Sequence, residues 1–390
     1  MKRLRTGDIV ASSVGGETVN AFVPAPLPPE PKIEWNESLH LTYERALNSL
    51  GRLDGMASVL PSPDIFLYAY VRKEALLSSQ IEGTQSTLAD LLKFEAGDTP
   101  LAFDDVREVS NYVDAAEFGV RRIKKLPISS RLMRELHERL LKSGRGNSKD
   151  PGAFRRSQNW IGGSRPGNAL FVPPPHARIA ECIANLETFI HDQPEKTPAL
   201  VKAAVAHVQF ETIHPFLDGN GRVGRLLIVL VLISEGLLRQ PLLYLSLYLK
   251  EHRGEYYDLL QRVRAEGDWE AWLEFFFRGV HETADAAVAT ATTLLKLFHR
   301  DNDRVEQLGR PGITAQRVLK AFQGAPILSA KQIVEKSGAT LATVNRALEQ
   351  LESLRIVREV TGRKRDRLWA YSAYIAELSK GTAPLPQEFR

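Results

Sequence analysis

Residues 214–225 read His-Pro-Phe-Leu-Asp-Gly-Asn-Gly-Arg-Val-Gly-Arg, and an apolar run over 226–233 follows at once. The run predicts a helix, and the glycines predict that its first turn lies within the quoted stretch. A helix start leaves backbone N–H groups unpaired and carries partial positive charge, so it favours a bound phosphate. The stretch therefore predicts a helix that begins at an anion-binding turn.

The side chains of this turn suit a nucleotide. Gly219 and Gly221, on either side of Asn220, allow the backbone to approach a ligand closely and to form a concave nest. Arg222 and Arg225 are three residues apart, so they lie on one side of the predicted helix and can reach the same polyphosphate. We expect a backbone nest and a pair of cations that bind phosphate groups.

Two further residues of the stretch carry chemistry. Asp218 offers the hard oxygen ligand that Mg²⁺ prefers, and His214 can take a proton near neutral pH. Each of these residue types is also common in ordinary turns before helices. Their joint occurrence favours nucleotide transfer, and the absence of a P-loop or Rossmann glycine pattern excludes those two nucleotide folds.

The stretch resembles the core motif of Fic-domain proteins, His-x-Phe-x-(Asp/Glu)-Gly-Asn-Gly-Arg-x-x-Arg, at every fixed position. The resemblance implies a helical core and transfer of AMP from ATP to a Tyr, Thr or Ser hydroxyl of a target protein. His214 would deprotonate that hydroxyl, and Asp218 would hold Mg²⁺. The implied nucleotide-binding residues are Glu82, His214, Gly219, Asn220, Gly221, Arg222, Val223, Gly224, Arg225 and Tyr256, with the two arginines on the β- and γ-phosphates.

A second motif lies upstream. Residues 78–83 read Ser-Ser-Gln-Ile-Glu-Gly at the end of a predicted helix over 66–81. They resemble the family's inhibitory pattern (Ser/Thr)-x-x-x-Glu-(Gly/Asn), with Ser78, Glu82 and Gly83 at the fixed places. The resemblance implies that Glu82 pairs with Arg225, so that ATP binds only in an unproductive pose. From the residues alone, a helix C-terminus capped by glycine is the alternative.

Two more regions belong to the resemblance. Turn residues between β-formers at 160–161 and 170–172 predict a β-hairpin within 152–175. In the family, such a flap holds the target's extended segment beside ATP. A connector rich in proline and glycine is the alternative. Downstream, the resemblance implies that Tyr256 or Tyr257 packs against the adenine, and core packing on a helix is the stronger alternative for either residue.

Bulk properties set the frame. A chain of 390 residues predicts two or three units, and 43% hydrophobic with 25% charged residues is typical of globular proteins. The run over 226–233 is too short to span a membrane, so no membrane association is expected. A single cysteine, Cys182, and the lack of an apolar signal core after the first residues favour the cytoplasm.

The C-terminal region differs from the rest. Helical patterns over 330–337 and 340–354, with a turn at Gly338, are followed by a hairpin pattern over 356–371. This order resembles a winged helix. Residues 310–390 hold 14 Lys and Arg against 7 Asp and Glu, although the whole chain is only +4. We expect DNA contacts from Arg346 and from residues 363–367, with a protein-interaction module as the alternative.

The predicted fold class is mainly α: a helical Fic core with a small β-hairpin flap, plus a C-terminal winged-helix (α+β) domain. The predicted segments are an N-terminal arm and helical region with the inhibitory motif (1–125), the core (126–285), a helical connector (286–310), the winged-helix-like module (311–375) and a tail (376–390).

Two classes of function are open. The first is a protein adenylyltransferase that uses Mg-ATP and is held inactive by Glu82, with AMP removal from a modified protein as a variant. The second is a DNA-binding regulator whose core only senses nucleotide. His214 favours the enzyme, because sensing ATP needs no base. The expected partners are a target protein with a hydroxyl side chain, DNA through 311–375 and a second copy in a homodimer.

Overall fold

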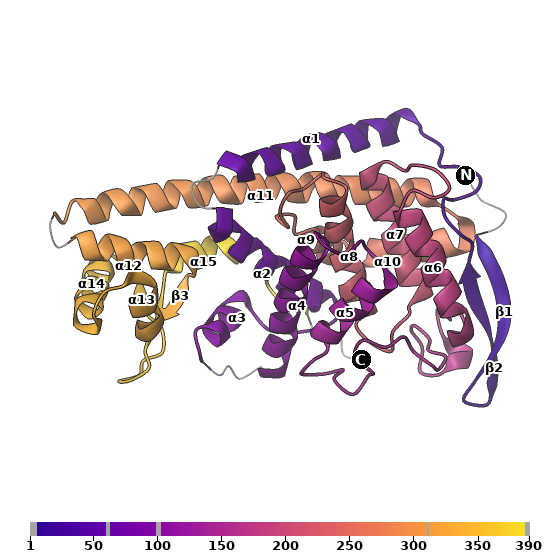
Figure 1. Cartoon of the computed structure of the whole chain (residues 1–390), viewed down its shortest axis with the longest axis horizontal. Helices are drawn as coiled ribbons and strands as arrows, with labels where there is room; N and C mark the ends of the chain where they lie inside the picture. The colour runs from indigo at the N-terminus through magenta and orange to yellow at the C-terminus, as the bar shows by residue number, and fades with distance from the viewer. Residues whose placement is uncertain (1–5, 60–62, 99–102, 310–311, 387–390) are drawn as a thin grey trace.

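The computed structural model describes residues 6–59, 63–98, 103–309 and 312–386. Over these residues the chain is mainly helical and carries two small antiparallel sheets. Figure 1 shows an elongated molecule with most helices at one end and a C-terminal module at the other. The predicted mainly α fold class is confirmed.

The N-terminal and core helices are α1 (Glu37–Val59), α2 (Pro63–Ile81), α3 (Leu88–Glu95), α4 (Phe103–Arg122), α5 (Ser130–Leu140), α6 (Ile179–Ile190), α7 (Ala199–Ile213), α8 (Asn220–Ser234), α9 (Ser246–Glu251), α10 (Arg253–Glu266) and α11 (Trp269–Glu306), with short 3₁₀ turns η1 (Pro166–Asn168) and η2 (His176–Arg178). The helix predicted over 66–81 is confirmed as α2, which begins three residues earlier and ends at the same residue.

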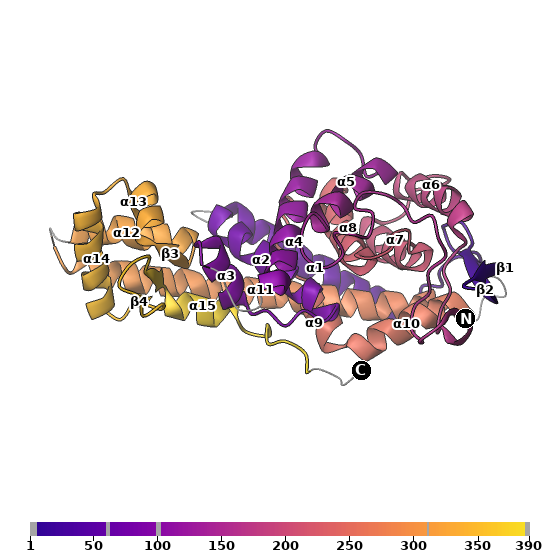
Figure 2. The ribbon, with the colours of Figure 1, turned by 90° about the horizontal axis from the view of Figure 1, so that it is seen from below.

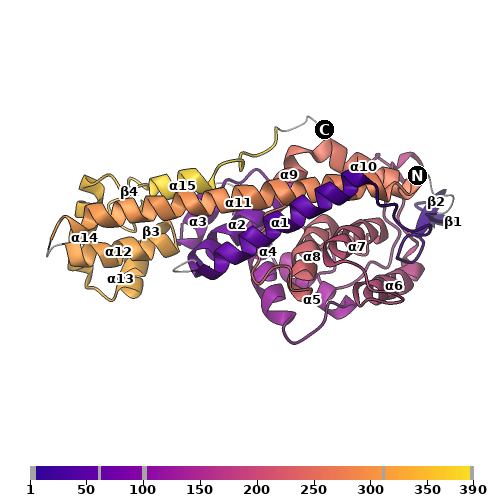
Figure 3. The same ribbon diagram turned by 90° about the horizontal axis from the view of Figure 1, so that it is seen from above.

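Helix α11 joins the two ends of the molecule. Its buried residues recur every three or four positions, as in Trp272, Phe276, Val280, Ala284 and Ala287, which gives the helix one continuous apolar side. Helix α1 packs along this long helix, and α12 and α15 contact its far end (Figure 3). The predicted boundary at 285/286 therefore lies inside an unbroken helix, and the boundary at 310/311 lies outside the described residues.

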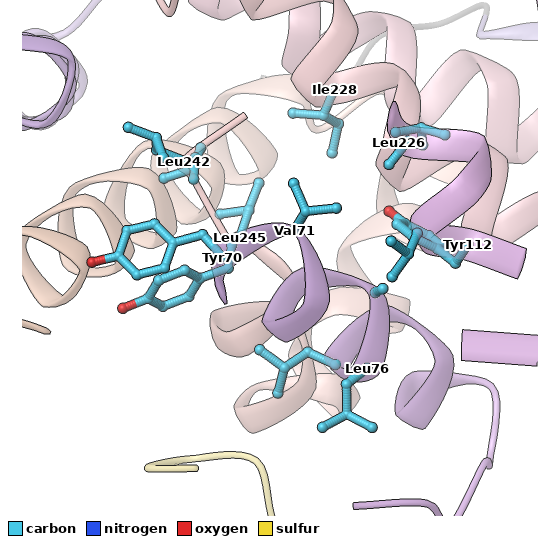
Figure 4. Packing of buried hydrophobic residues seen from close by; sticks show 14 of the residues in the cluster. Tyr70, Val71, Leu76, Tyr112, Leu226, Ile228, Leu242 and Leu245 are labelled. Atoms are coloured by element: carbon cyan, nitrogen blue, oxygen red, sulfur yellow. The ribbon is translucent and has the colours of Figure 1, made fainter. Parts of the chain in front are cut away.

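The core is built around helices with little polar surface. Helix α7 is buried on all sides except near its first residue, and α8 is buried along most of its length. Figure 4 shows Tyr70 of α2 beside Leu242 and Leu245, and Val71 of α2 on the side of Tyr112 of α4 and Leu226 of α8. This packing fixes the end of α2, which carries the predicted inhibitory motif, beside the start of α8.

The arm predicted over residues 1–34 is not simply extended. It contains a β-hairpin of β1 (Gly7–Val14) and β2 (Glu17–Pro24). Gly15 and Gly16 form the turn with φ of +57° and +84°, and positive φ at both central residues matches the twist of a tight hairpin. The many prolines after residue 23 masked this signal in the composition.

The two sides of the predicted flap pair at a single β-bridge. Ile161 and Phe171 form a single antiparallel bridge, and η1 lies between them. The backbone N–H of Phe22 in β2 donates to the carbonyl of Val172 over 2.9 Å. The N-terminal hairpin therefore extends the flap, a contact between segments about 150 residues apart that local patterns did not indicate.

The C-terminal module contains α12 (Gly312–Gly324), β3 (Ile327–Ser329), α13 (Ala330–Ser337), α14 (Leu341–Ser353), β4 (Arg358–Glu359), β5 (Leu368–Ala370) and α15 (Ser372–Leu378), with strand order β3-β5-β4. Gly338 has a φ of +67°, and the Thr340 side chain caps α14 by accepting from the N–H of Thr343. The predicted helices, turn and hairpin are confirmed, and the winged-helix assignment stays a prediction.

Several polar contacts join the C-terminal module and tail to the core. Arg363, in the loop between β4 and β5, forms a 2.9 Å ion pair with Asp98, just beyond α3. After α15 the chain returns beside α9 (Figure 2). There the carbonyl of Thr382 accepts from Nε2 of Gln80, in the last turn of α2, over 2.9 Å. No helix of the described residues is long and apolar enough to cross a membrane.

Trp272 tests the packing of α11 on the core. Its side chain is fully buried, and its indole N–H donates to the carbonyl of Ala204 in α7 over 3.0 Å. Trp272→Ala is expected to lower the free energy of unfolding by about 3–5 kcal/mol, measured by denaturant titration, because it leaves a cavity. Trp160→Ala, at a 38% exposed position, is the control and is expected to change little. Equal losses would contradict this view of the core.

Candidate active site

The end of α7 turns His214 toward the start of α8. His214 is the C-terminal cap of α7 and has a left-handed backbone with φ of +48° and ψ of 60°. Such a conformation is unusual for a residue with a side chain and often marks a functional site. The segment that follows is fixed by Asn220, whose side chain accepts from the N–H of Phe216 and donates to its carbonyl, both over 2.9 Å.

The helix start predicted within the stretch 214–225 is present. Gly219 caps α8 with a φ of +76°, a conformation that glycine adopts without strain, and the helix begins at Asn220. The first turn of a helix has N–H groups without intrahelical acceptors. The turn therefore presents donors beside His214, as the sequence predicted.

Arg225 is held by the end of α2. Its guanidinium donates to the hydroxyl of Ser78 over 2.8 Å, to the carbonyl of Ser78 over 2.9 Å and to the carboxylate of Glu82 over 2.7 Å. Gly221 leaves room for this pair, because a Cβ there would collide with Oε1 of Glu82. The predicted contact between Glu82 and Arg225 is confirmed.

Electrostatics keeps this pair ionised. Desolvation is the largest single influence and raises the pKa of Glu82. The charge and hydrogen bond of Arg225, together with the charges of Arg222 and His214, outweigh it, so the pKa of Glu82 lies below its ordinary value. The carboxylate of Glu82 is therefore charged at neutral pH. It pairs with Arg225, the residue that the sequence analysis expects to bind phosphate. Gly83 follows with a φ of +98°, which ends α2 at this point.

Arg222 has a partner that the motif did not indicate. It forms a 3.2 Å ion pair with Glu108 of α4 and a 3.5 Å ion pair with Asp218. Glu108 is buried and also accepts from Nε of Arg145 over 2.7 Å. The two motif arginines therefore lie on one helix but contact carboxylates from two different helices. No local spacing connects Glu108 with Arg222, since they are 114 residues apart.

Asp218 is open to solvent on one side. Its Oδ1 accepts from the N–H of Gly219 over 2.6 Å, and its side chain is 42% exposed. Its Oδ2 lies against Gly146, where a Cβ would approach to 2.7 Å. Among the described residues no cluster of three metal-ligating side chains occurs. The site thus offers one hard carboxylate, which fits Mg²⁺ bound mainly by substrate phosphates and water.

A cavity of about 570 Å³ lies beside Arg225 and His214, whereas Asp218 and Arg222 do not line it. Glu82, His214 and Arg225 line one end, and side chains of α10 and the flap line the other, namely Tyr256, Tyr257, Leu260, Ile161, Leu170 and Phe171. This size and mixture of apolar and polar groups suit a small ligand. Tyr256 is 1% exposed and its hydroxyl contacts Nε2 of His207 over 2.9 Å, so it is part of both the cavity wall and the core.

The cavity keeps His214 neutral. Burial lowers the pKa of His214 to about 3, and the charges of Arg264 and Arg155 act in the same direction. A neutral imidazole can accept a proton at neutral pH. Arg264 and Glu211 also line the cavity, and sequence reasoning did not select either of them. Glu211 lies one helical turn before His214, which was the one available signal.

The fold and site define a mainly helical protein in which a carboxylate at the end of α2 pairs with an arginine near the start of α8. Residues 41–121 match the Fic/DOC family N-terminal model, and residues 127–232 match the Fic/DOC family model. The chain therefore carries the Fic N-terminal and Fic domains.

A protein adenylyltransferase Fic from Drosophila persimilis is 28% identical over 291 residues, which cover 70% of this chain and 54% of that protein. The chain thus spans about half the length of such curated relatives. A Fic family protein from Desulfovibrio desulfuricans G20 has a TM-score of 0.57 at 19% identity, covering 87% of this chain and 97% of the other. Fic-1 from C. elegans has a TM-score of 0.50 at 22% identity, covering 65% and 74%. These structures show a shared fold.

Proposed function

We propose that the chain is a protein adenylyltransferase, which transfers AMP from ATP to a Tyr, Thr or Ser hydroxyl of a target protein. The observation that carries the proposal is the placement of a neutral His214 beside the open start of α8, at the end of the same cavity. The names of the curated relatives point to the same reaction.

The residues suggest a direct displacement. His214 takes the proton of the target hydroxyl, and the hydroxyl oxygen attacks the α-phosphorus of ATP. The bond between the α-phosphorus and the bridging oxygen breaks, and diphosphate leaves with that electron pair. The N–H groups of the first turn of α8 face the charge that develops on the α-phosphate, while Arg222 and Arg225 bind the β- and γ-phosphates.

The proposed metal ligand is Asp218. A Mg²⁺ ion held there would neutralise charge on the phosphates. Asp218→Ala is expected to reduce AMP transfer by about 10² or more and to weaken its dependence on Mg²⁺, measured by titrating the metal in the Glu82→Gly background. Glu255→Ala, which removes a half-exposed acid on α10 that does not line the cavity, is the control. Full activity of the Glu82→Gly parent in excess EDTA would rule out the metal role.

The proposed activity is tested with α-labelled ATP and Mg²⁺ on the full chain. The Glu82→Gly variant is expected to place label on protein, either on itself or on a protein from a cell extract. A variant that also carries His214→Ala is expected to place none. If Glu82→Gly labels no protein in any extract while it binds ATP, the adenylyltransferase proposal fails.

Removal of AMP from a modified protein is a second candidate. The Glu82 side chain is 35% exposed and faces the cavity that His214 also lines, so it can orient a water molecule there. Under this alternative Glu82→Gly lowers the release of AMP from an AMP-modified protein. Under the first candidate it raises transfer instead.

We also propose that the C-terminal module binds duplex DNA. Arg346 on α14 and Arg365 in the loop between β4 and β5 are exposed, whereas Arg363 is paired with Asp98. Binding by the full chain is expected to weaken steeply as salt rises, measured by fluorescence anisotropy. Arg346→Ala with Arg365→Ala is expected to weaken it by roughly tenfold and to flatten the salt dependence. Lys124→Ala with Lys125→Ala, exposed on the core, is the control. No binding at low salt favours a protein contact.

Cys182 is free and buried, which suits a reducing compartment such as the cytoplasm.

A further inference from the structure

Glu211 is a buried carboxyl group with an unused acceptor. The residue is 7% exposed, and its Oε1 has no hydrogen-bond partner within the part of the chain that the structure describes. Buried polar atoms are nearly always hydrogen-bonded, because leaving one unpaired is unfavourable. A carboxyl group with an unpaired oxygen, on a side chain that lines a ligand-sized cavity, indicates that a bound ligand supplies a partner to that group.

The position of Glu211 is built by two helices. It lies on α7 one turn before His214, and it lines the cavity together with Arg225, Tyr256 and Arg264. On α8, a Cβ at Gly224 would collide with Oε1 of Glu211. The absence of a side chain at Gly224 therefore makes the space in which the carboxyl group lies, and this gives that motif glycine a specific role.

The cations near Glu211 are engaged elsewhere. Arg225 binds Ser78 and Glu82. Arg264 donates to the backbone carbonyl of Glu211 over 3.3 Å and to the hydroxyl of Thr212 over 3.2 Å. Neither guanidinium has a hydrogen bond to the carboxyl group of Glu211 among the described contacts. Burial raises the pKa of Glu211 to about 7, with the nearby Glu82 acting in the same direction and Arg225 opposing both.

The chemistry of the cavity selects the kind of partner. A carboxyl group repels phosphate, so Glu211 does not serve the anion-binding end of the ligand. We propose that Glu211 recognises the nucleoside, by accepting a hydrogen bond from a sugar hydroxyl or from an exocyclic amino group of the base. The inference rests on the proposed nucleotide transfer, because the phosphates must lie at the start of α8 for the nucleoside to extend past His214 toward Tyr256.

The test compares nucleotides and variants in pairs. In the full chain with Glu82→Gly, where Arg225 is free for phosphate, dissociation constants are measured for ATP, 2′-deoxy-ATP, 3′-deoxy-ATP and inosine triphosphate. Glu211→Leu is expected to raise the dissociation constant for ATP about tenfold. Glu211→Gln is expected to keep most of the affinity, because its amide oxygen still accepts a hydrogen bond. Glu211→Met, also without an acceptor, replaces the leucine variant if that variant does not fold.

One analogue identifies the partner. The parent is the Glu82→Gly chain with Glu211 intact. The nucleotide that lacks the group bound by Glu211 is expected to bind this parent more weakly than ATP does. The affinity for that nucleotide is expected to be the same in the Glu211→Leu variant. A loss with inosine triphosphate points to the exocyclic amine, and a loss with a deoxy nucleotide points to that hydroxyl. Equal affinity of the parent and Glu211→Leu for ATP overturns the inference, as does an equal loss for all four nucleotides.

A control variant, and the binding of nucleotide with Glu211 intact, distinguish failure of the Glu211 role from failure of the proposed function. Glu255→Leu removes a half-exposed acid on α10 that does not line the cavity, and it is expected to leave all four affinities unchanged. If no variant with Glu211 intact binds any of the four nucleotides, the proposed function fails. If ATP binds and is transferred but Glu211→Leu changes nothing, the function stands and the role of Glu211 fails.

Discussion

Glu82→Gly is expected to raise AMP transfer by on the order of 10² or more. In the structure Glu82 binds Arg225 over 2.7 Å, and its charge lies beside the place proposed for the γ-phosphate. ATP that cannot reach Arg225 does not present its α-phosphorus in line with the target hydroxyl, so in-line attack is lost. Removing the carboxylate frees the arginine for phosphate. The rate is measured with α-labelled ATP at saturating concentration.

The double variant identifies the route of inhibition. Arg225→Ala is expected to abolish transfer whether or not Glu82 is present, because the γ-phosphate then has no partner. Glu82→Gly should therefore give no rescue in the Arg225→Ala background. Glu255→Gly, a change of the same kind at an exposed position on α10, controls for the loss of a negative charge. An unchanged rate in Glu82→Gly would refute the inhibitory role of the segment 78–83.

His214→Ala is expected to lower the transfer rate by about 10²–10⁴ in the Glu82→Gly background while leaving ATP binding nearly intact. The imidazole is the one titratable base among residues 214–225 apart from the proposed metal ligand Asp218. Because the pKa of His214 is lowered to about 3, its protonation does not limit the rate near neutral pH. Single-turnover kinetics with labelled ATP measure the loss.

The matched control is His176→Ala, because His176 is exposed and does not line the cavity. It is expected to transfer AMP at the rate of its parent. Wild-type rates in His214→Ala would show that another group removes the proton, and a loss of ATP binding of the same size would show that His214 mainly holds the nucleotide.

The site was predictable where its chemistry is local in sequence. The stretch 214–225 contains a helix start, two cations and a base within twelve residues, so its local conformation follows from spacing and from glycine geometry. The pair between Glu82 and Arg225 joins residues 143 positions apart. Only the resemblance to a known family connected them, because no physical signal in the sequence brings α2 to α8.

The features that sequence reasoning missed depend on tertiary packing. Glu108 reaches Arg222 from α4, and Glu211 became notable only when the cavity showed an acceptor without a partner. The contact of β2 with the flap likewise joins distant segments. In the C-terminal module, by contrast, Gly338 and Thr340 carry their own conformational preferences, and the helices and hairpin there were predicted from the residues.

Helix α11 sets the distance between the core and the C-terminal module. At 1.5 Å per residue, its 38 residues span roughly 57 Å. Its first half packs against the core that holds the cavity, and its last turns carry α12 and α15. If the C-terminal module binds a partner, as proposed, helix α11 would hold that partner at a set distance instead of on a flexible tether. The hydroxyls of the partner that could be modified would then be those within reach of His214.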